Sequence, residues 1–276
     1  MNLELKAQII KLIQRQDSHS ASNLLSILTK LQGEADVSNF INSTDKHGDT
    51  MLHFACRAHN MIIIECLIEK LGADISAINE HGRQPLHESV DSRECVQYLL
   101  SRGALVDCTK RGDWTCLHIS AMKGNLSVVK LLAEHGAIIS FRNRDGWNAL
   151  HLACREGHID IVEYLLSKDS TCWNNPTKNG RYPVHTAALY SHLHLVKLLL
   201  NTAPDTVSVK DNGGLNVLQN AVIGGNPELV RVLVVQYHAD MESTDNIGRS
   251  PLHHACLTGH LEIVEVLVEL GVNVAV

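Results

Sequence analysis

The sequence predicts an all-α solenoid of stacked helix–turn–helix repeats with β-turn tips, and three observations lead to this prediction. A core of the form Leu-His-x-Ala recurs at Leu52–Ala55, Leu150–Ala153 and Leu252–Ala255. The histidine or its substitute stands at positions 53, 87, 118, 151, 185, 219 and 253, at spacings of 31 to 34 residues. Each copy is followed by an apolar stripe at helical spacing that has no partner within its own repeat. Neighbouring repeats must therefore stack to bury it.

Each repeat is expected to open with a tight turn and a capped helix. Gly146 illustrates the turn tip, and Asp113 fills that position in the third repeat. Both residue types tolerate the positive φ of such a turn. Hydroxyl or amide side chains follow at the expected N-cap, at positions 50, 115, 148 and 250, and proline opens the helix at positions 85, 183 and 251.

The repeat period divides the chain into an N-terminal segment and seven repeats. The repeats span about 45–77, 78–108, 109–141, 142–175, 176–209, 210–243 and 244–276. Residues 1–44 lack the motif, and their apolar positions predict a helical capping pair. One helix would bury Leu5, Ile9, Leu12 and Ile13, and the other Leu24, Leu25, Leu28 and Leu31. No polar repeat follows the seventh, so we expect further chain or a partner to cover its apolar face.

The sequence departs from the repeat at three places, and at the deletion in the second repeat we expect irregular local geometry. The first repeat carries one extra residue before Gly72, and the second is two residues short after His87. The deletion removes the turn that normally separates the two helices. Gln219 stands where the other repeats have histidine, and we expect it to break the inter-repeat ladder and let the C-terminal repeats open before the central ones.

Composition restricts the partner class and the compartment. The chain has 276 residues, of which 45% are hydrophobic, and 24 Lys and Arg against 30 Asp and Glu give a net charge of −6. This balance gives no overall reason to bind nucleic acid or an anionic membrane directly. The sequence contains no spanning apolar run and no cationic leader. We expect a monomer that is cytoplasmic, with a nuclear pool.

The cysteines and histidines do not predict catalysis or a metal. No C-x-x-C pair occurs among the eight cysteines, and Cys56, Cys154 and Cys256 follow the motif histidine where a small buried residue suits helix packing. Six of the 17 histidines are the repeat histidine itself, one per repeat, which predicts a ladder instead of a converging ligand set. We therefore expect no enzyme activity, no cofactor and no metal.

The turn tips supply the candidate binding surface. The residue between tip and N-cap is Arg83, Trp114, Trp147 and Arg181 in four successive repeats. Tryptophan and arginine are enriched among interface hot spots, so these positions predict a protein partner. Residues at the ends of the first helices should line the same side: Arg57, Met122, Arg155, Leu189 and Tyr190. The alternative is that large residues fit this slot for structural reasons alone.

The motif and its period resemble the ankyrin repeat family, a fold of stacked helix pairs that binds proteins. Within that family, four segments look like an ankyrin-repeat co-regulator of alanyl-tRNA synthetase: Gln84–Glu88, Cys95–Lys110, Asp113–Thr115 and Asn143–Gly157. The resemblance implies binding to the catalytic domain of alanyl-tRNA synthetase and a role in translational fidelity. It also implies that lysine side chains accept misactivated serine before the serine reaches tRNA(Ala).

The sequence departs from that resemblance at the capture lysines, whose positions read here as Arg111, Arg144 and Asn174. A guanidinium stays protonated and is a poor acyl acceptor. Lys110 and Lys178 lie nearby as substitutes, or else are ordinary surface lysines.

Two alternative functions stay open beside synthetase binding. The first is a generic adaptor for another protein. The second is an RNA binder that uses Arg111, Arg142 and Arg144, which the negative net charge disfavours.

Overall fold

The computed structural model describes residues 3–15, 23, 26–27, 30 and 37–274. Their backbone forms two compact units, Met1–Ser120 with Asn125–Ile138, and Ala121–Gly124 with Ile139–Val276. Among these residues helices dominate and one short hairpin is present, so the all-α prediction is confirmed. No described helix combines the length and apolar character that spanning a bilayer requires.

The first unit begins with a helix that covers the first repeat. In α1 (Leu3–Arg15), Ile9 and Ile13 are fully buried, and the helix packs on α4 (Met51–Arg57). The predicted second capping helix, with Leu24, Leu25, Leu28 and Leu31, lies outside the described residues, and a short helix, α3 (Val37–Asn42), was not predicted.

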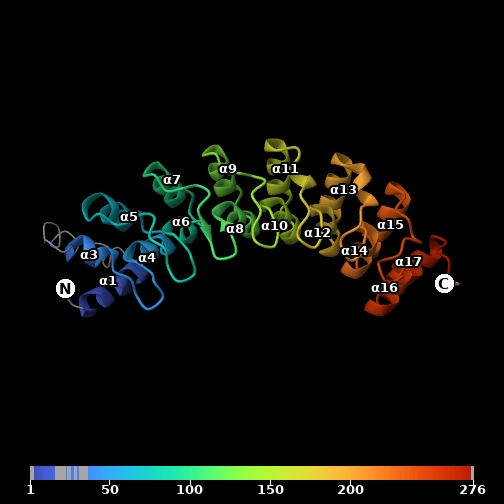
Figure 1. The fold of residues 1–276 in the computed structure, drawn as a ribbon, viewed down its shortest axis with the longest axis horizontal. Helices are drawn as coiled ribbons and strands as arrows, with labels where there is room; N and C mark the ends of the chain where they lie inside the picture. The colour runs from blue at the N-terminus through green and yellow to red at the C-terminus, as the bar shows by residue number, and fades with distance from the viewer. Residues whose placement is uncertain (1–2, 16–22, 24–25, 28–29, 31–36, 275–276) are drawn as a thin grey trace. The chain divides into compact units, whose positions relative to one another are not determined.

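The remaining elements of the first unit are helix pairs and one hairpin, in which α4 packs on α6 and α7 on α9 (Figure 1). They are α5 (Met61–Glu65), η1 (Cys66–Lys70), α6 (Pro85–Glu88), α7 (Arg93–Ser101), β1 (Thr109–Lys110), β2 (Trp114–Thr115), α8 (Cys116–Lys123, whose last three residues belong to the second unit) and α9 (Leu126–Glu134).

The second unit continues with four helix pairs. Its first helices stack in sequence order, α10 on α12, α12 on α14 and α14 on α16 (Figure 1). The elements are α10 (Ala149–Glu156), α11 (Ile159–Lys168), η2 (Cys172–Asn174), α12 (Pro183–Leu189), α13 (Leu193–Thr202), η3 (Pro204–Val207), α14 (Val217–Gly224), α15 (Pro227–Tyr237), α16 (Pro251–Thr258) and α17 (Leu261–Glu269).

The turn chemistry agrees with the sequence prediction. Gly146 has φ of 82° and Asp113 has φ of 62°, so both tips adopt the left-handed conformation. A side chain at Gly146 would also meet the backbone nitrogen of Lys178 at 2.8 Å. Asn148 and Ser250 accept hydrogen bonds at the starts of α10 and α16, as N-caps should.

The motif histidines form the predicted ladder within each unit. The Nε2 atoms of His53 and His151 lie 3.0 and 3.1 Å from carbonyl oxygens of the following repeat, and that of His185 lies 2.8 Å from the carbonyl oxygen of Val209, where its own repeat ends. The prediction that Gln219 breaks the ladder is wrong. Its side-chain nitrogen donates to the carbonyl oxygen of Ser243, at the end of its own repeat, and to that of Arg249 in the next repeat, because an amide reaches the same acceptors as an imidazole.

The first two repeats absorb their length changes in different ways. The extra residue of the first repeat is accommodated by a π-helical turn, Cys66–Lys70, which holds one residue more per turn than an α-helix. The deletion in the second repeat leaves α6 with only four residues, Pro85–Glu88, before a turn leads into α7. The irregularity predicted at the deletion is therefore confirmed, whereas the π-helical turn of the first repeat was not predicted.

Seven of the eight cysteines are buried, and among them are two of the three for which burial was predicted. Cys56 and Cys154 are fully buried, whereas Cys256 is exposed, contrary to the prediction. Cys256 lies beside Leu257, which is 67% exposed, on a face of α16 that stays open among the described residues.

Candidate functional site

Two arginines of the first unit share one buried carboxylate. Arg57 Nε and Arg83 Nη1 each lie 3.1 Å from a different oxygen of Glu88, and Arg57 Nη2 lies 3.0 Å from Asp49. The Glu88 side chain is 5% exposed, whereas both guanidinium groups reach solvent. Burial acts to raise the pKa of Glu88, but the hydrogen bonds from Arg57 and Arg83 outweigh it and lower the pKa. The carboxylate therefore stays ionised and fixes both cations.

An aromatic and a lysine lie beside each other on the hairpin of the same unit. Lys110 faces Trp114 across the two strands, and its Nζ lies 5.1 Å from the centre of the indole ring. The indole is half-buried and packs at a tilt on His118, with ring centres 6.0 Å apart. Burial lowers the pKa of Lys110, and the charge of Arg83 lowers it further. We define Arg57, Arg83, Lys110 and Trp114 as the first-unit patch.

In the second unit, the predicted tip residues are again anchored by buried groups. Trp147 is half-buried and packs on His151 with ring centres 5.7 Å apart. Arg181 Nε lies 3.2 Å from Asp211, whose side chain is 4% exposed. The buried carboxylate thus holds the arginine in place while about a third of its side chain, 32%, stays exposed.

The ends of the first helices add a second aromatic pair. The Arg155 guanidinium lies 5.8 Å from the centre of the Tyr190 ring, and the two side chains are 42% and 47% exposed. Leu189, also predicted to line this side, ends α12 and is half-buried, as is Met122. We define Trp147, Arg155, Arg181 and Tyr190 as the second-unit patch.

A second histidine ladder positions these helix ends, and this role of the histidines was not predicted from the sequence. Nε2 of His158 lies 3.2 Å from the carbonyl oxygen of Met122, and Nε2 of His192 lies 2.9 Å from that of Arg155. A side chain at Gly157 would come within 2.6 Å of the His192 ring, so the glycine leaves room for it. The available signal was the recurrence of histidine after the inter-helix turn.

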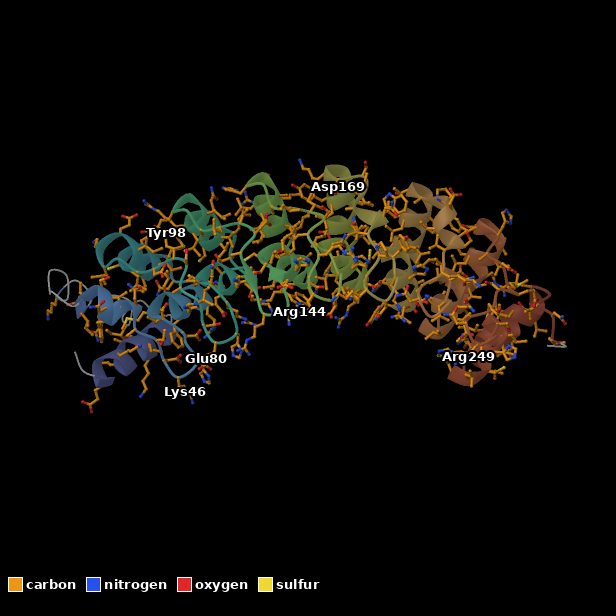
Figure 2. The ribbon with its side chains drawn as sticks, in the orientation of Figure 1. Lys46, Glu80, Tyr98, Arg144, Asp169 and Arg249 are labelled. Carbon is orange, nitrogen blue, oxygen red and sulfur yellow. The ribbon has the colours of Figure 1, made fainter. Side chains whose placement is uncertain are left out.

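The predicted capture residues are dispersed. Lys178 and Asn174 are exposed, and so are Arg111 of the first unit and Arg144 of the second. In the first unit, Lys46 and Glu80 lie near successive turn tips, and Tyr98 lies on the opposite edge of the unit (Figure 2). Lys110, the other predicted acceptor, contacts an aromatic residue of the predicted surface, Trp114.

Among the arginines of the RNA hypothesis, Arg142 is engaged by backbone groups of its own unit. Arg142 donates from Nε to the carbonyl oxygen of Gly146 at 3.2 Å and from Nη2 to that of Pro176. Its guanidinium therefore has backbone partners, which reduces what it can offer to a phosphate.

Comparison with known proteins shows that the repeats of this chain match a known repeat family. The family model described as ankyrin repeats (three copies) matches residues 18–112, 92–175, 169–245 and 206–276. An ankyrin repeat-containing protein of Schizosaccharomyces pombe is 33% identical over 34% of this chain and 42% of its own length. A Bos taurus SMC5-SMC6 complex localization factor is 33% identical over 42% of this chain and 10% of its own length.

A third relative is the probable 26S proteasome regulatory subunit p28 of Saccharomyces cerevisiae, 30% identical over 34% of this chain. The match covers 42% of that subunit, so the chain spans less than half the length of each relative described here.

Proposed function

The chain belongs to the ankyrin-repeat family, whose repeats form protein-interaction modules, and on that premise we propose that it binds the catalytic domain of alanyl-tRNA synthetase. The choice of partner follows from the resemblance of Gln84–Glu88, Cys95–Lys110 and Asn143–Gly157 to ankyrin repeat domain-containing protein 16. The proposed role is to limit serine mischarging of tRNA(Ala), without catalysis by this chain, in the cytoplasm and a nuclear pool.

The anchoring of the exposed arginines is the observation that carries the proposal. Arg57 and Arg83 are held by Glu88, and Arg181 by Asp211, through carboxylates that are almost fully buried. A side chain fixed before binding loses less conformational entropy when the partner arrives. Together with Trp114 and Trp147, these groups offer the residue types that dominate hot spots. The patches therefore suit a protein surface with carboxylates and apolar pockets.

Lys110 supports a minor capture activity better than Lys178 does. An amine attacks an aminoacyl adenylate only when it is unprotonated. Burial beside Trp114 and the neighbouring charge of Arg83 lower the pKa of Lys110, which raises the fraction of free amine at neutral pH. The same partial burial limits the access of an adenylate, so we expect capture to be weak.

The test of the interaction is direct binding of the purified chain to the synthetase catalytic domain by titration calorimetry. We expect Trp147→Ala to weaken the complex by roughly 2 kcal/mol or more, which is the range of an interface hot spot. Trp173→Ala is the matched control, since Trp173 lies in η2 of the same unit and not at a turn tip. Arg181→Ala and Arg231→Ala form a second pair, because Arg231 is an exposed helix arginine paired with Glu269.

Circular dichroism of each variant checks that the repeats stay folded. Loss of helical signal in Trp147→Ala would assign that tryptophan to the fold. An intact chain that shows no affinity for the synthetase would favour the alternative, an adaptor for another protein partner.

A further inference from the structure

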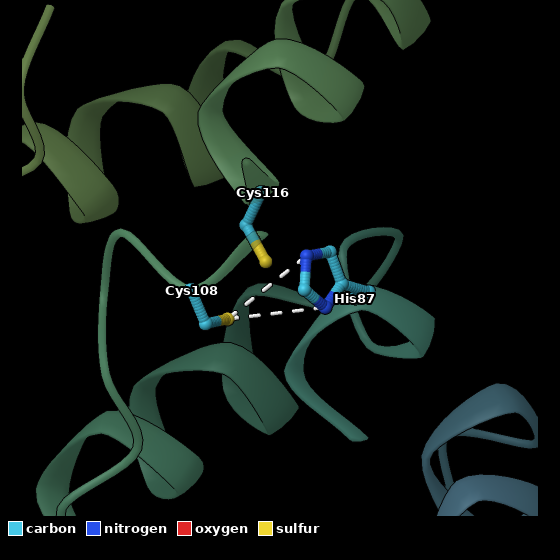
Figure 3. A group of neighbouring side chains, drawn as sticks. All are labelled: His87, Cys108 and Cys116. Carbon is cyan, nitrogen blue, oxygen red and sulfur yellow. Dashed lines mark hydrogen bonds between the residues drawn. The ribbon is translucent and has the colours of Figure 1, made fainter. Parts of the chain in front are cut away.

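Three side chains that offer soft metal ligands converge inside the first unit, beneath the hairpin that carries Lys110 and Trp114. His87, Cys108 and Cys116 are 3%, 7% and 0% exposed, and one ligand atom from each lies within 4.8 Å of the others. Sγ of Cys108 lies 3.8 Å from Nδ1 and 4.0 Å from Nε2 of His87. Both sulfur atoms point toward the imidazole ring (Figure 3).

The hairpin explains why two cysteines that are distant in sequence meet. Thr109 pairs with Thr115 and Lys110 with Trp114, so Cys108 and Cys116 occupy the next pair of facing positions. Facing residues of an antiparallel pair have Cβ atoms about 4.5–5.5 Å apart. The short helix α6 brings His87 against this pair. Seven residues stand between Cys108 and Cys116, a spacing that no common metal motif has. The sequence alone therefore gave no signal for a metal site.

We propose that His87, Cys108 and Cys116 bind a zinc ion through one imidazole nitrogen and two thiolates, with water at the fourth position. Zinc with sulfur at about 2.3 Å and nitrogen at about 2.0 Å in tetrahedral geometry separates its ligand atoms by about 3.5–3.8 Å. The distances from Cys108 to the two ring nitrogens are within a few tenths of an ångström of that range. Because the three ligand atoms lie within 4.8 Å of one another, zinc binding would draw them together by up to about 1 Å.

Charge balance favours a divalent ion, and the thiolate and imidazole ligands make zinc the usual choice among divalent ions. Two thiolates and a neutral imidazole cancel the charge of a divalent ion, and a buried site disfavours a net charge. A monovalent copper ion would leave one negative charge, and magnesium or calcium prefer oxygen ligands. Binding releases one proton from each thiol to solvent and changes no oxidation state.

If Nδ1 of His87 binds the zinc, Nε2 can keep its present contact with a backbone carbonyl oxygen. Nδ1 now accepts a hydrogen bond from the backbone of Gln84 at 3.1 Å, and Nε2 lies 3.3 Å from the carbonyl oxygen of Trp114. Coordination through Nδ1 gives up the first bond and lets Nε2–H go on donating to Trp114. A backbone carbonyl is a usual outer partner of a metal-bound histidine. The ion would then tie α6, shortened by the deletion, to the hairpin.

The test measures zinc in the intact chain, purified with a non-chelating reductant, by inductively coupled plasma mass spectrometry. We expect about one zinc per chain, and less than about a tenth of that in Cys108→Ser or Cys116→Ser, because each removes an anionic ligand. Cys154→Ser is the matched control, since Cys154 is a fully buried thiol of the second unit. It should keep the zinc.

Cobalt supplies a second readout that does not depend on the variants. Replacing zinc with Co²⁺ in the folded chain should give thiolate-to-cobalt charge-transfer absorption and the visible bands of a tetrahedral site. A folded, reduced chain that takes up neither metal would overturn the proposal, and so would equal loss of metal in Cys154→Ser. A Cys108–Cys116 disulfide that forms readily, with no metal uptake after its reduction, would assign the pair to redox chemistry instead.

Discussion

The side-chain amide of Gln219 donates a hydrogen bond to the carbonyl oxygen of Arg249, 3.1 Å away in the next repeat. The same nitrogen lies 3.2 Å from the carbonyl oxygen of Ser243, and the side-chain oxygen accepts from the backbone of Asn216 at 3.0 Å. His185 makes the matching pair of contacts, accepting from Tyr182 and reaching Val209. Gln219 therefore makes the same kind of hydrogen bonds as a repeat histidine, although its amide does not titrate.

We predict that Gln219→His leaves stability nearly unchanged, whereas Gln219→Ala lowers the free energy of unfolding by about 1–3 kcal/mol. The alanine variant leaves buried backbone groups without partners, which costs that amount. Urea unfolding followed by circular dichroism measures both variants. An alanine variant as stable as the parent chain would show that water replaces the amide at no cost.

The repeat histidines also make stability depend on pH. Burial lowers the pKa of His185, and the charge of Arg181 acts in the same direction, while the hydrogen bond to Val209 and the charge of Asp211 only partly oppose this. In the unfolded chain the pKa returns to about 6.5. Below that value the unfolded state takes up a proton that folded His185 does not, so stability falls as the pH drops and rises again with increasing pH.

Replacing His185 with glutamine tests this, because Gln219 shows that the fold accepts an amide there. Between pH 7 and 5 we expect the parent chain to lose stability, and His185→Gln to lose about 1–2 kcal/mol less. Part of the pH dependence of stability should remain in His185→Gln, since burial lowers the pKa of His53 too. His194→Gln, at an exposed histidine on α13, is the control. Equal pH dependence of all three chains would contradict the assignment.

The repeat period was sufficient to predict the helices and turn tips, because each tip depends on local chemistry. Gly146 and Asp113 have the positive φ values that their residue types suggested. The sequence could not show that a different residue makes the inter-repeat hydrogen bonds where the repeat histidine is missing. The exchange of histidine for an amide at Gln219 depends on acceptors 24 and 30 residues further along the chain.

The candidate site was predictable in residue type but not in organisation. Arg83 and Arg181 stand at the tips as expected, but their anchoring carboxylates come from outside the tip pattern, Glu88 at the end of α6 and Asp211 in the turn of the next repeat. The meeting of Cys108 and Cys116 depends on strand register, which no helical period contains. Such contacts between unlike positions give no periodic signal.

The last prediction concerns serine capture and rests on the proposed function, whose resemblance places Arg111 and Arg144 at the positions of capture lysines. Both side chains are exposed, so each can attract an anionic synthetase surface or a bound adenylate. Only a deprotonated amine takes up the acyl group, and a guanidinium does not deprotonate near neutral pH. We therefore expect the parent chain to bind the synthetase but to capture serine weakly.

Restoring the two lysines should separate binding from capture. We predict that Arg111→Lys with Arg144→Lys increases serine adducts several-fold while the affinity for the synthetase changes little, because the charge is conserved. The measurement is mass spectrometry of modified lysines after incubation with synthetase, ATP and serine. Arg231→Lys, at an exposed helix arginine paired with Glu269, is the control and should add no adduct. Abundant adducts on Lys110 or Lys178 of the parent chain would contradict weak capture and assign the acceptor role to those neighbouring amines.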